Sequence, residues 1–117
     1  MPDPKLPEEF EIAVSDDKGT VTIRCAGELD IAVMTMVMDA VQAILRRPPK
    51  EITLDWTGLT FMDSSGIRVL MRTLALCRDS RVDLTWVLSD AARKTLDMVG
   101  IHDALLREYV SGGSGAD

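Results

Sequence analysis

The segment ITLDWTGLTFMDSSGI, Ile52–Ile67, carries the strongest structural signal in this chain. Its first eleven residues form an extended apolar run, and the apolar spacing of Ile67–Leu76 predicts a helix directly afterwards. The tetrapeptide DSSG (residues 63–66) lies between them, with Asp63 or Ser64 placed to cap the helix. The leading N–H groups of a helix lack internal partners, and the helix dipole favours negative charge there. A phosphate on a serine at this point would therefore be well accommodated.

The composition of the 117 residues is that of one soluble globular domain, with 46% hydrophobic and 27% charged residues. The net charge of −6 argues against nucleic acid as the main partner and against an anionic membrane surface. No apolar run approaches the roughly 20 residues that span a bilayer, and the amino terminus lacks the features of a signal peptide. We expect a cytoplasmic protein without membrane or nucleic-acid partners.

The cysteines and the histidine do not indicate a metal or redox centre. Cys25 and Cys77 occupy apolar-pattern positions, so we interpret both as reduced core residues. One histidine, His102, and two unclustered cysteines are too few for a zinc site. We therefore predict no cofactor and no metal.

The first half of the chain predicts a β-hairpin followed by a helix. Two alternating runs, Phe10–Val14 and Val21–Cys25, are joined by a turn signal at residues 16–19. The sequence GELD (residues 27–30) is predicted to end the second strand, with Asp30 as the N-cap of a helix from Ile31 to about Arg47.

The second half predicts alternating strands and helices. In order, the expected elements are a strand Glu51–Trp56, a helix from the DSSG segment to about Arg78, a strand Val82–Leu88, a helix Asp90–Val99 capped by Ser89 and ended by Gly100, and a possible short strand Arg107–Val110. We expect a flexible amino terminus (residues 1–9), one domain (residues 10–110) and a disordered tail (residues 111–117).

The order of these elements predicts an α/β fold with a mixed four- to five-stranded sheet and an N-terminal β-hairpin. Asp83 and Thr85 alternate with apolar residues in the predicted fourth strand. The sheet is therefore unlike one buried on both faces, and we expect the helices to pack mainly on one face.

The segment LDWTGLTFMDSSGI (residues 54–67) resembles the signature of STAS domains, specifically of the bacterial anti-sigma-factor antagonists. GELD (residues 27–30) and LDMVGI (residues 96–101) match the family's turn into its first helix and the segment before its last helix. The resemblance implies the STAS fold from about residue 10 to residue 110. Trp56 and Arg68 depart from the pattern, since the family more often has smaller residues at both positions.

The resemblance also implies a function. In this family the unphosphorylated antagonist binds an anti-sigma factor, often itself a serine kinase, and so frees a sigma factor. Phosphorylation of the first serine after the motif aspartate ends this binding, and a serine phosphatase reverses it. By position the acceptor is Ser64, between Asp63 and Ser65. Such a protein is a kinase substrate and not an enzyme.

The helical pattern after the motif supports an exposed Ser64. Ile67, Leu70, Leu74 and Cys77 form one apolar stripe, and Ser64 lies off it, in line with Arg68 one turn later. Arg68 could reach a phosphate on Ser64, although Arg68 and Arg72 could equally be a solvated face. The residues predicted to bind the partner are Asp63, Ser64, Ser65, Gly66, Arg68, Asp30, Met34 and Met38.

The first helix is unusually apolar. Val33, Val37, Ala40 and Ile44 are predicted to face the core. Ile31, Met34 and Met38 flank its narrow polar stripe and are expected to be hard to bury. Such a surface suits a protein partner or a homodimer, whereas the alternative is that neighbouring loops cover it.

Three alternatives stay open beside the phosphorylation switch. The DSSG segment could be only a helix cap, or the chain could be an unswitched STAS scaffold or ligand-binding module in a stress-sensing or lipid-transport complex. A serine hydrolase using His102 is disfavoured, because Met62 and Ser64 stand where a nucleophile elbow needs glycines. Other hydroxyl groups that could accept a phosphate are those of Thr57, Thr60 and Ser65.

Overall fold

A β-hairpin opens the part of the chain that the computed structural model describes, residues 10–98 and 100. Strands β1 (Phe10–Asp17) and β2 (Thr20–Leu29) pair antiparallel. Lys18 and Gly19 join them with positive φ angles of 53° and 94°. A two-residue turn with positive φ at both positions matches the right-handed twist of the strands, so the predicted hairpin is confirmed.

Strands and helices alternate after the hairpin. The remaining elements are α1 (Ile31–Leu45), β3 (Glu51–Met62), α2 (Ser64–Ser80), β4 (Asp83–Leu88) and α3 (Asp90–Met98). The strand order is β1-β2-β3-β4, and β3 pairs in parallel with both β2 and β4. The predicted α/β fold with a mixed sheet is thus confirmed with four strands, and the possible strand Arg107–Val110 lies outside the described residues.

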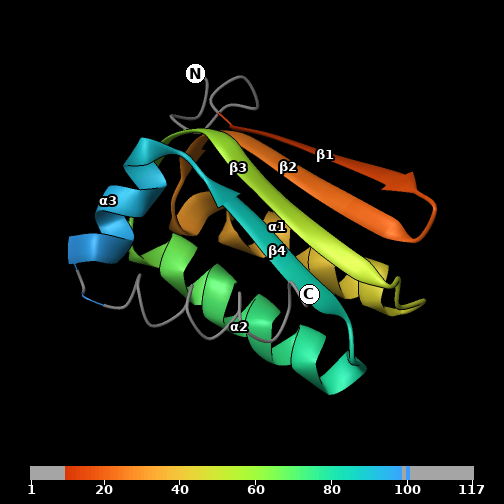
Figure 1. The fold of residues 1–117 in the computed structure, drawn as a ribbon. Coiled ribbons are helices and arrows are strands. Elements are labelled where there is room, and N and C mark those ends of the chain that lie inside the picture. Colours follow the sequence, from red (N-terminus) through yellow and green to blue (C-terminus); the bar gives the residue numbers. More distant parts are fainter. Residues whose placement is uncertain (1–9, 99, 101–117) are drawn as a thin grey trace.

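The helices α1 and α2 pack side by side against one face of the sheet, and α3 lies at one end of it (Figure 1). The inward face carries rows of buried side chains in register across the parallel strands, such as Val21, Ile52 and Leu84. The adjacent row, Thr22, Thr53 and Thr85, is only half-buried and lies on the opposite face. Because side chains alternate along a strand, this pattern confirms that the helices cover mainly one face.

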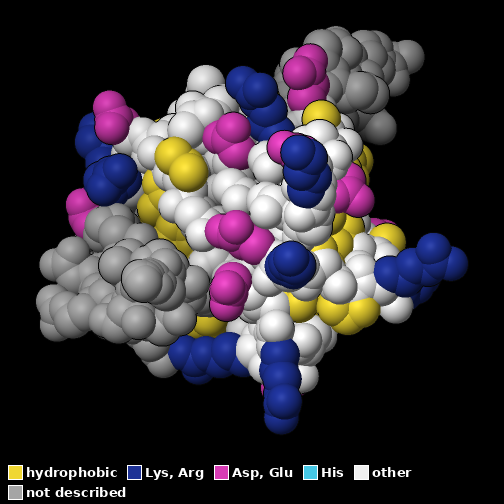
Figure 2. Space-filling model, turned by 45° about the vertical axis from the view of Figure 1, so that its right-hand side comes forward, with side chains coloured by type: hydrophobic (Ala, Val, Ile, Leu, Met, Phe, Trp, Pro, Cys, Tyr) yellow, Lys and Arg dark blue, Asp and Glu magenta, His cyan; other side chains and the backbone are white. Residues whose placement is uncertain are grey.

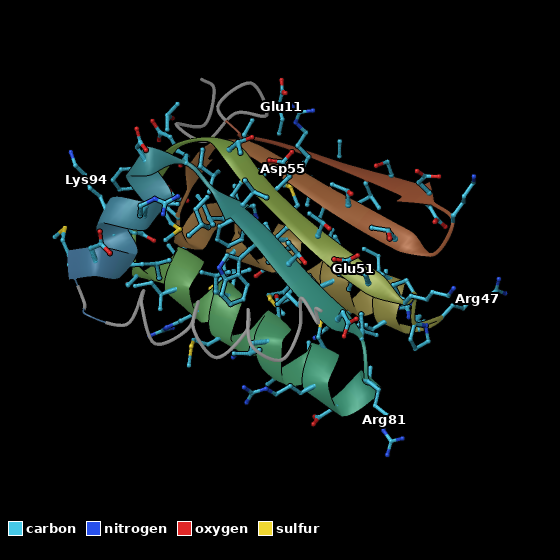
Figure 3. The ribbon with its side chains drawn as sticks, viewed as in Figure 1. Glu11, Arg47, Glu51, Asp55, Arg81 and Lys94 are labelled. Atoms are coloured by element: carbon cyan, nitrogen blue, oxygen red, sulfur yellow. The ribbon has the colours of Figure 1, made fainter. Side chains whose placement is uncertain are left out.

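The surface of the described residues carries charges of both signs. In the view of Figure 2, acidic and basic side chains are interspersed and neither gathers into a continuous patch. Glu51 and Asp55 of β3 project from the face of the sheet that α1 and α2 leave open (Figure 3). None of the helices in the described part of the chain is long and apolar enough to cross a membrane.

Three strands are longer than predicted. β1 continues past Val14 to Asp17. β2 continues through Gly27 to Leu29, because Gly27 takes a φ of 99° and the register with β3 shifts on either side of it. Such bulges bend a strand without ending it, so the strand ends inside the predicted segment 27–30, at Leu29, and not at Gly27. β3 likewise continues past Trp56 to Met62.

The helix boundaries differ only slightly from the prediction. α1 ends at Leu45 with Arg46 as its C-cap. α2 extends to Ser80 and is closed by Arg81, which takes the left-handed conformation. Gly100 has the predicted positive φ, 74°. Cys25, Cys77 and Trp56 are buried, and the two thiols are free, as expected for core residues.

Candidate functional site

The starts of α1 and α2 lie together at the carboxyl ends of β2 and β3. Asp30 caps α1, because its Oδ1 accepts a 2.9 Å hydrogen bond from the main-chain N–H of Ala32. Asp63 caps α2 in the same way, accepting a 2.8 Å bond from the N–H of Ser65. Both predicted caps are confirmed, and the structure assigns the second one to Asp63.

The Ser64 side chain is therefore not needed to cap the helix. Ser64 is the first residue of α2 and is exposed. Among the described residues, no hydrogen bond involves its hydroxyl group. Ser65, by contrast, keeps only 6% of its surface exposed. Two hydroxyls that look interchangeable in sequence thus lie in different environments, and of the two residues only Ser64 is exposed.

The neighbouring threonine hydroxyls are engaged in local hydrogen bonds. Thr57 Oγ1 donates a 2.7 Å bond to Oδ1 of Asp55. Thr60 Oγ1 donates a 3.3 Å bond to the carbonyl oxygen of Gly27. Ser64 therefore differs from both of these alternative acceptors, although all three residues are exposed.

Gly66 allows α2 to begin directly against the sheet. A Cβ atom at this position would collide with Cγ and Sδ of Met62 and would lie 3.1 Å from Cδ2 of Leu29. Met62 and Leu29 are both buried and are paired in register across β3 and β2. The glycine thus sets how closely the β3–α2 junction (residues 62–66) approaches the start of α1.

The faces of α2 are largely as predicted. Leu70, Leu74 and Cys77 are buried and Ile67 is half-buried against the core, whereas Arg68 is exposed one turn after Ser64. Val69 and Thr73 are buried as well, so the buried stripe is wider than the sequence pattern indicates. Arg72 is also exposed and continues the line from Ser64 and Arg68.

The prediction that Met38 is hard to bury was wrong. Met38 is only 5% exposed, and the hydroxyl of Thr73 on α2 lies 3.9 Å from its sulfur, because α2 packs over this side of α1. Met34 is half-buried against the core. Val33 and Val37 face the core as predicted, whereas Ala40 and Ile44 are only half-buried.

Exposed apolar side chains nevertheless lie beside the β3–α2 junction. Ile31, the first residue of α1, is 69% exposed, and Phe61, near the end of β3, is 47% exposed. The sequence pattern missed Phe61, because the irregular pairing of β3 with β2 beyond Gly58 breaks simple alternation. Met36 is the other exposed large residue of α1.

A contact from α3 is a second feature that sequence reasoning missed. Thr95 Oγ1 donates a 2.6 Å hydrogen bond to the carbonyl oxygen of Met62, the last residue of β3. The two residues are 33 positions apart. No local sequence signal could have identified this pair.

Three titratable groups of the described residues have a shifted pKa. Hydrogen bonds from Thr57, with the Arg24 guanidinium 4.0 Å away, lower the pKa of Asp55. Burial raises the pKa of the Cys25 thiol to about 12 and that of Cys77 to about 11, so neither is a thiolate nucleophile. Within residues 10–98 and 100, no cluster of His, Cys, Asp or Glu side chains could hold a metal ion. His102 lies outside the described residues.

Comparison with known proteins gives consistent matches. The family model described as "Mlab, STAS domain" matches residues 12–108. The anti-sigma F factor antagonist of Paenibacillus polymyxa is 31% identical over 94 residues, which cover 79% of this chain and 80% of that protein. The anti-sigma-F factor antagonist RsfB of Mycobacterium tuberculosis is 22% identical over 67 residues, covering 57% of this chain and 55% of RsfB.

Two solved structures share the fold. An anti-sigma factor antagonist from Mycobacterium paratuberculosis superposes with a TM-score of 0.69 at 20% identity, covering 85% of each chain. The antagonist SpoIIAA in its unphosphorylated form superposes with a TM-score of 0.64 at 24% identity, covering 84% of this chain and 96% of SpoIIAA.

Proposed function

Because this chain belongs to the STAS domain family and resembles its anti-sigma-factor antagonists, we propose that it works by partner switching. The unphosphorylated protein binds an anti-sigma factor that is also a serine kinase, and a sigma factor is released. Transfer of a phosphate to Ser64 ends this binding, and a serine phosphatase restores it. The protein acts in the cytoplasm as a kinase substrate and a binding partner, without catalysis of its own.

The observation that carries this proposal is the exposure of Ser64 at the start of α2, beside a cap that Asp63 already provides. A kinase must bring the acceptor hydroxyl in line with the γ-phosphate of ATP, so an exposed hydroxyl without competing hydrogen bonds is the best substrate. Ser65 is buried, and Thr57 and Thr60 donate their hydroxyl protons to other groups.

The electrostatics of the β3–α2 junction explain how one phosphate could act as a switch. A phosphoserine carries about −1.5 to −2 charges near pH 7. The start of α2 tolerates this charge in the isolated protein, and Arg68 is close enough along the helix to pair with it. In a complex that covers Ser64, the same charge would be removed from water without a cation of the partner to pair with it, which is energetically costly. A thousandfold weaker complex needs only about 4 kcal/mol.

Apolar side chains beside the acceptor provide contact area for the partner. Ile31 directly follows the cap Asp30, and Phe61 lies two residues before Asp63. Both are exposed, and Met34, about one turn after Ile31 in α1, is half-buried against the core. We propose that the anti-sigma factor covers Ile31 and Phe61, which places Ser64 inside the interface.

A homodimer through α1 stays a prediction, and it would use Met36 and not the buried Met38.

The acceptor assignment can be tested with purified protein. Wild type, Ser64→Ala and Ser65→Ala are incubated with ATP and the serine kinase recovered from the source cells on the immobilised wild-type chain, and the products are mapped by tandem mass spectrometry. We expect one phosphate on wild type and on Ser65→Ala, and none on Ser64→Ala. Equal incorporation into Ser64→Ala would contradict the assignment.

The switch itself needs a binding measurement. Phosphoserine can be installed at position 64 by genetic code expansion, which removes any dependence on kinase yield. We expect the phosphorylated protein to bind the anti-sigma factor at least a hundredfold more weakly, about 2.7 kcal/mol, and Ser64→Glu to show part of the effect. Unchanged affinity for both forms would favour the unswitched scaffold.

A further inference from the structure

The end of β3 extends beyond its neighbour β4. The pairing of β4 with β3 stops where Leu88 meets Trp56, and Ser89 N–H then donates to the Trp56 carbonyl oxygen at 3.2 Å. Within the part of the chain that the structure describes, residues 57–62 of β3 therefore have no strand beside them on that edge, and α3 packs there instead (Figure 1). Unpaired strand carbonyls in a half-buried position need another donor.

Thr95 supplies that donor for the last carbonyl of β3. Its half-buried hydroxyl donates to the Met62 oxygen at 2.6 Å, and it also lies 3.3 Å from the Ala91 oxygen one turn back in α3. A threonine in a helix ordinarily bonds to the carbonyl four residues earlier. The hydroxyl has one proton and the Met62 distance is much shorter, so the bond to the strand is the principal one.

We propose that Thr95 is a positioning residue for the modification of Ser64, acting through Met62; this rests on the function proposed above. Met62 directly precedes the cap Asp63, so the hydroxyl of α3 fixes the main chain one residue before the cap and two before the acceptor. α3 thereby holds the β3–α2 junction in the geometry that presents the Ser64 hydroxyl to a kinase.

Amide hydrogen exchange by NMR on the full chain tests the positioning directly. Thr95→Val removes the hydroxyl while keeping the shape, and Thr95→Ser restores it. The monitors are the N–H groups of Asp63 and Ser65, and the reference is Val82 N–H, which bonds to the Cys77 oxygen at the far end of α2. We expect Thr95→Val to speed exchange at the monitors about fivefold.

The reference amide should keep its wild-type exchange rate in Thr95→Val, and Thr95→Ser should restore the monitors. A matched control is Thr85→Val, which removes a 2.7 Å hydroxyl bond to Glu51 on the open face of the sheet. Unchanged monitors in Thr95→Val, or equal acceleration at Val82, would overturn the proposal.

Phosphorylation kinetics supply the functional readout. We expect Thr95→Val to lower kcat/KM for Ser64 about fivefold, while Thr95→Ser and Thr85→Val stay at the wild-type value. Faster exchange in Thr95→Val with wild-type kinetics would refute a role in modification. If wild type accepts no phosphate at Ser64, the proposed function fails by itself, and the positioning of Ser64 for modification falls with it.

Discussion

The main-chain N–H of Asp63 donates a 3.3 Å hydrogen bond to the carbonyl oxygen of Leu29, which connects the start of α2 to the residue before the cap of α1. Leu29 and Met62 are also the last residues in register between the parallel strands β2 and β3. The starts of α1 and α2 are thus joined by a main-chain hydrogen bond. The same substitution can therefore be made at the caps Asp30 and Asp63, and its effects on stability compared.

Removing the Asp63 side chain should destabilise the protein by about 1 kcal/mol, because the Ser65 N–H loses its acceptor. Asp63→Ala and Asp63→Asn are compared by urea unfolding. We expect Asp63→Asn to stay close to wild type, because asparagine caps helices as well as aspartate does. Asp30→Ala is the matched control at α1 and should cost a similar amount. Wild-type stability of Asp63→Ala would show that this cap contributes nothing.

Gly66→Ala should destabilise the fold by about 1–3 kcal/mol, because the new methyl group has no room against Met62 and Leu29. Thermal or urea unfolding measures the loss. Ser64→Ala serves as the neighbouring control and should change stability by less than about 0.5 kcal/mol, since Ser64 is exposed. Equal stability of Gly66→Ala and wild type would mean that the junction can move away from the sheet at no cost.

Arg68 should change the ionisation of a phosphate on Ser64. A nearby guanidinium favours the doubly charged phosphate, so Arg68→Ala should raise the second pKa of phosphoserine 64. A pH titration followed by ³¹P NMR on protein with genetically installed phosphoserine measures it. Arg72→Ala, two turns from the acceptor and equally exposed, is the control and should leave the midpoint in place. Identical midpoints for Arg68→Ala and wild type would assign Arg68 to an ordinary solvated face.

The two buried thiols should make stability fall with rising pH. Their pKa values are about 12 for Cys25 and about 11 for Cys77 in the folded protein, against 9.0 for an unperturbed thiol. Above about pH 9 the unfolded chain releases these protons while the folded one keeps them, so alkali favours unfolding. The expected loss reaches about 1.4 kcal/mol per pH unit for each thiol.

Urea unfolding at pH 7.5, 9 and 10 under reducing conditions measures this dependence. The variant with Cys25→Ala and Cys77→Ala should be less stable at pH 7.5 because it leaves cavities, yet its stability should vary less over this range. A wild-type free energy of unfolding that stays constant or rises from pH 9 to pH 10 would contradict the prediction.

Features that depend on neighbouring residues could be predicted from the sequence. Asp30 and Ser89 cap their helices as expected, because a cap is decided by the few residues that follow it. The exposure of Ser64 followed from helical phase once the core stripe of α2 was recognised. The hairpin followed from two alternating runs and a glycine-containing turn.

Features that depend on distant partners could not be predicted. Gly27 looks like a strand terminator until the pairing of β2 with β3 converts it into a bulge. Met38 is buried only because α2 packs beside it, and the pattern of α1 alone gives no information about that neighbour. The hydrogen bond from Thr95 to Met62 likewise exists only after α3 has reached the end of β3.

The contacts around the β3–α2 junction join residues far apart in the sequence, which affects when these contacts form during folding. The bonds from Thr60 to Gly27 and from Thr95 to Met62 each span 33 positions, and such non-local contacts form more slowly than local ones during folding. A newly made chain therefore contains Ser64 before these contacts have formed. Under the proposed mechanism, an incompletely folded copy would neither bind the anti-sigma factor nor accept a phosphate. Only fully folded molecules would therefore take part in the switch.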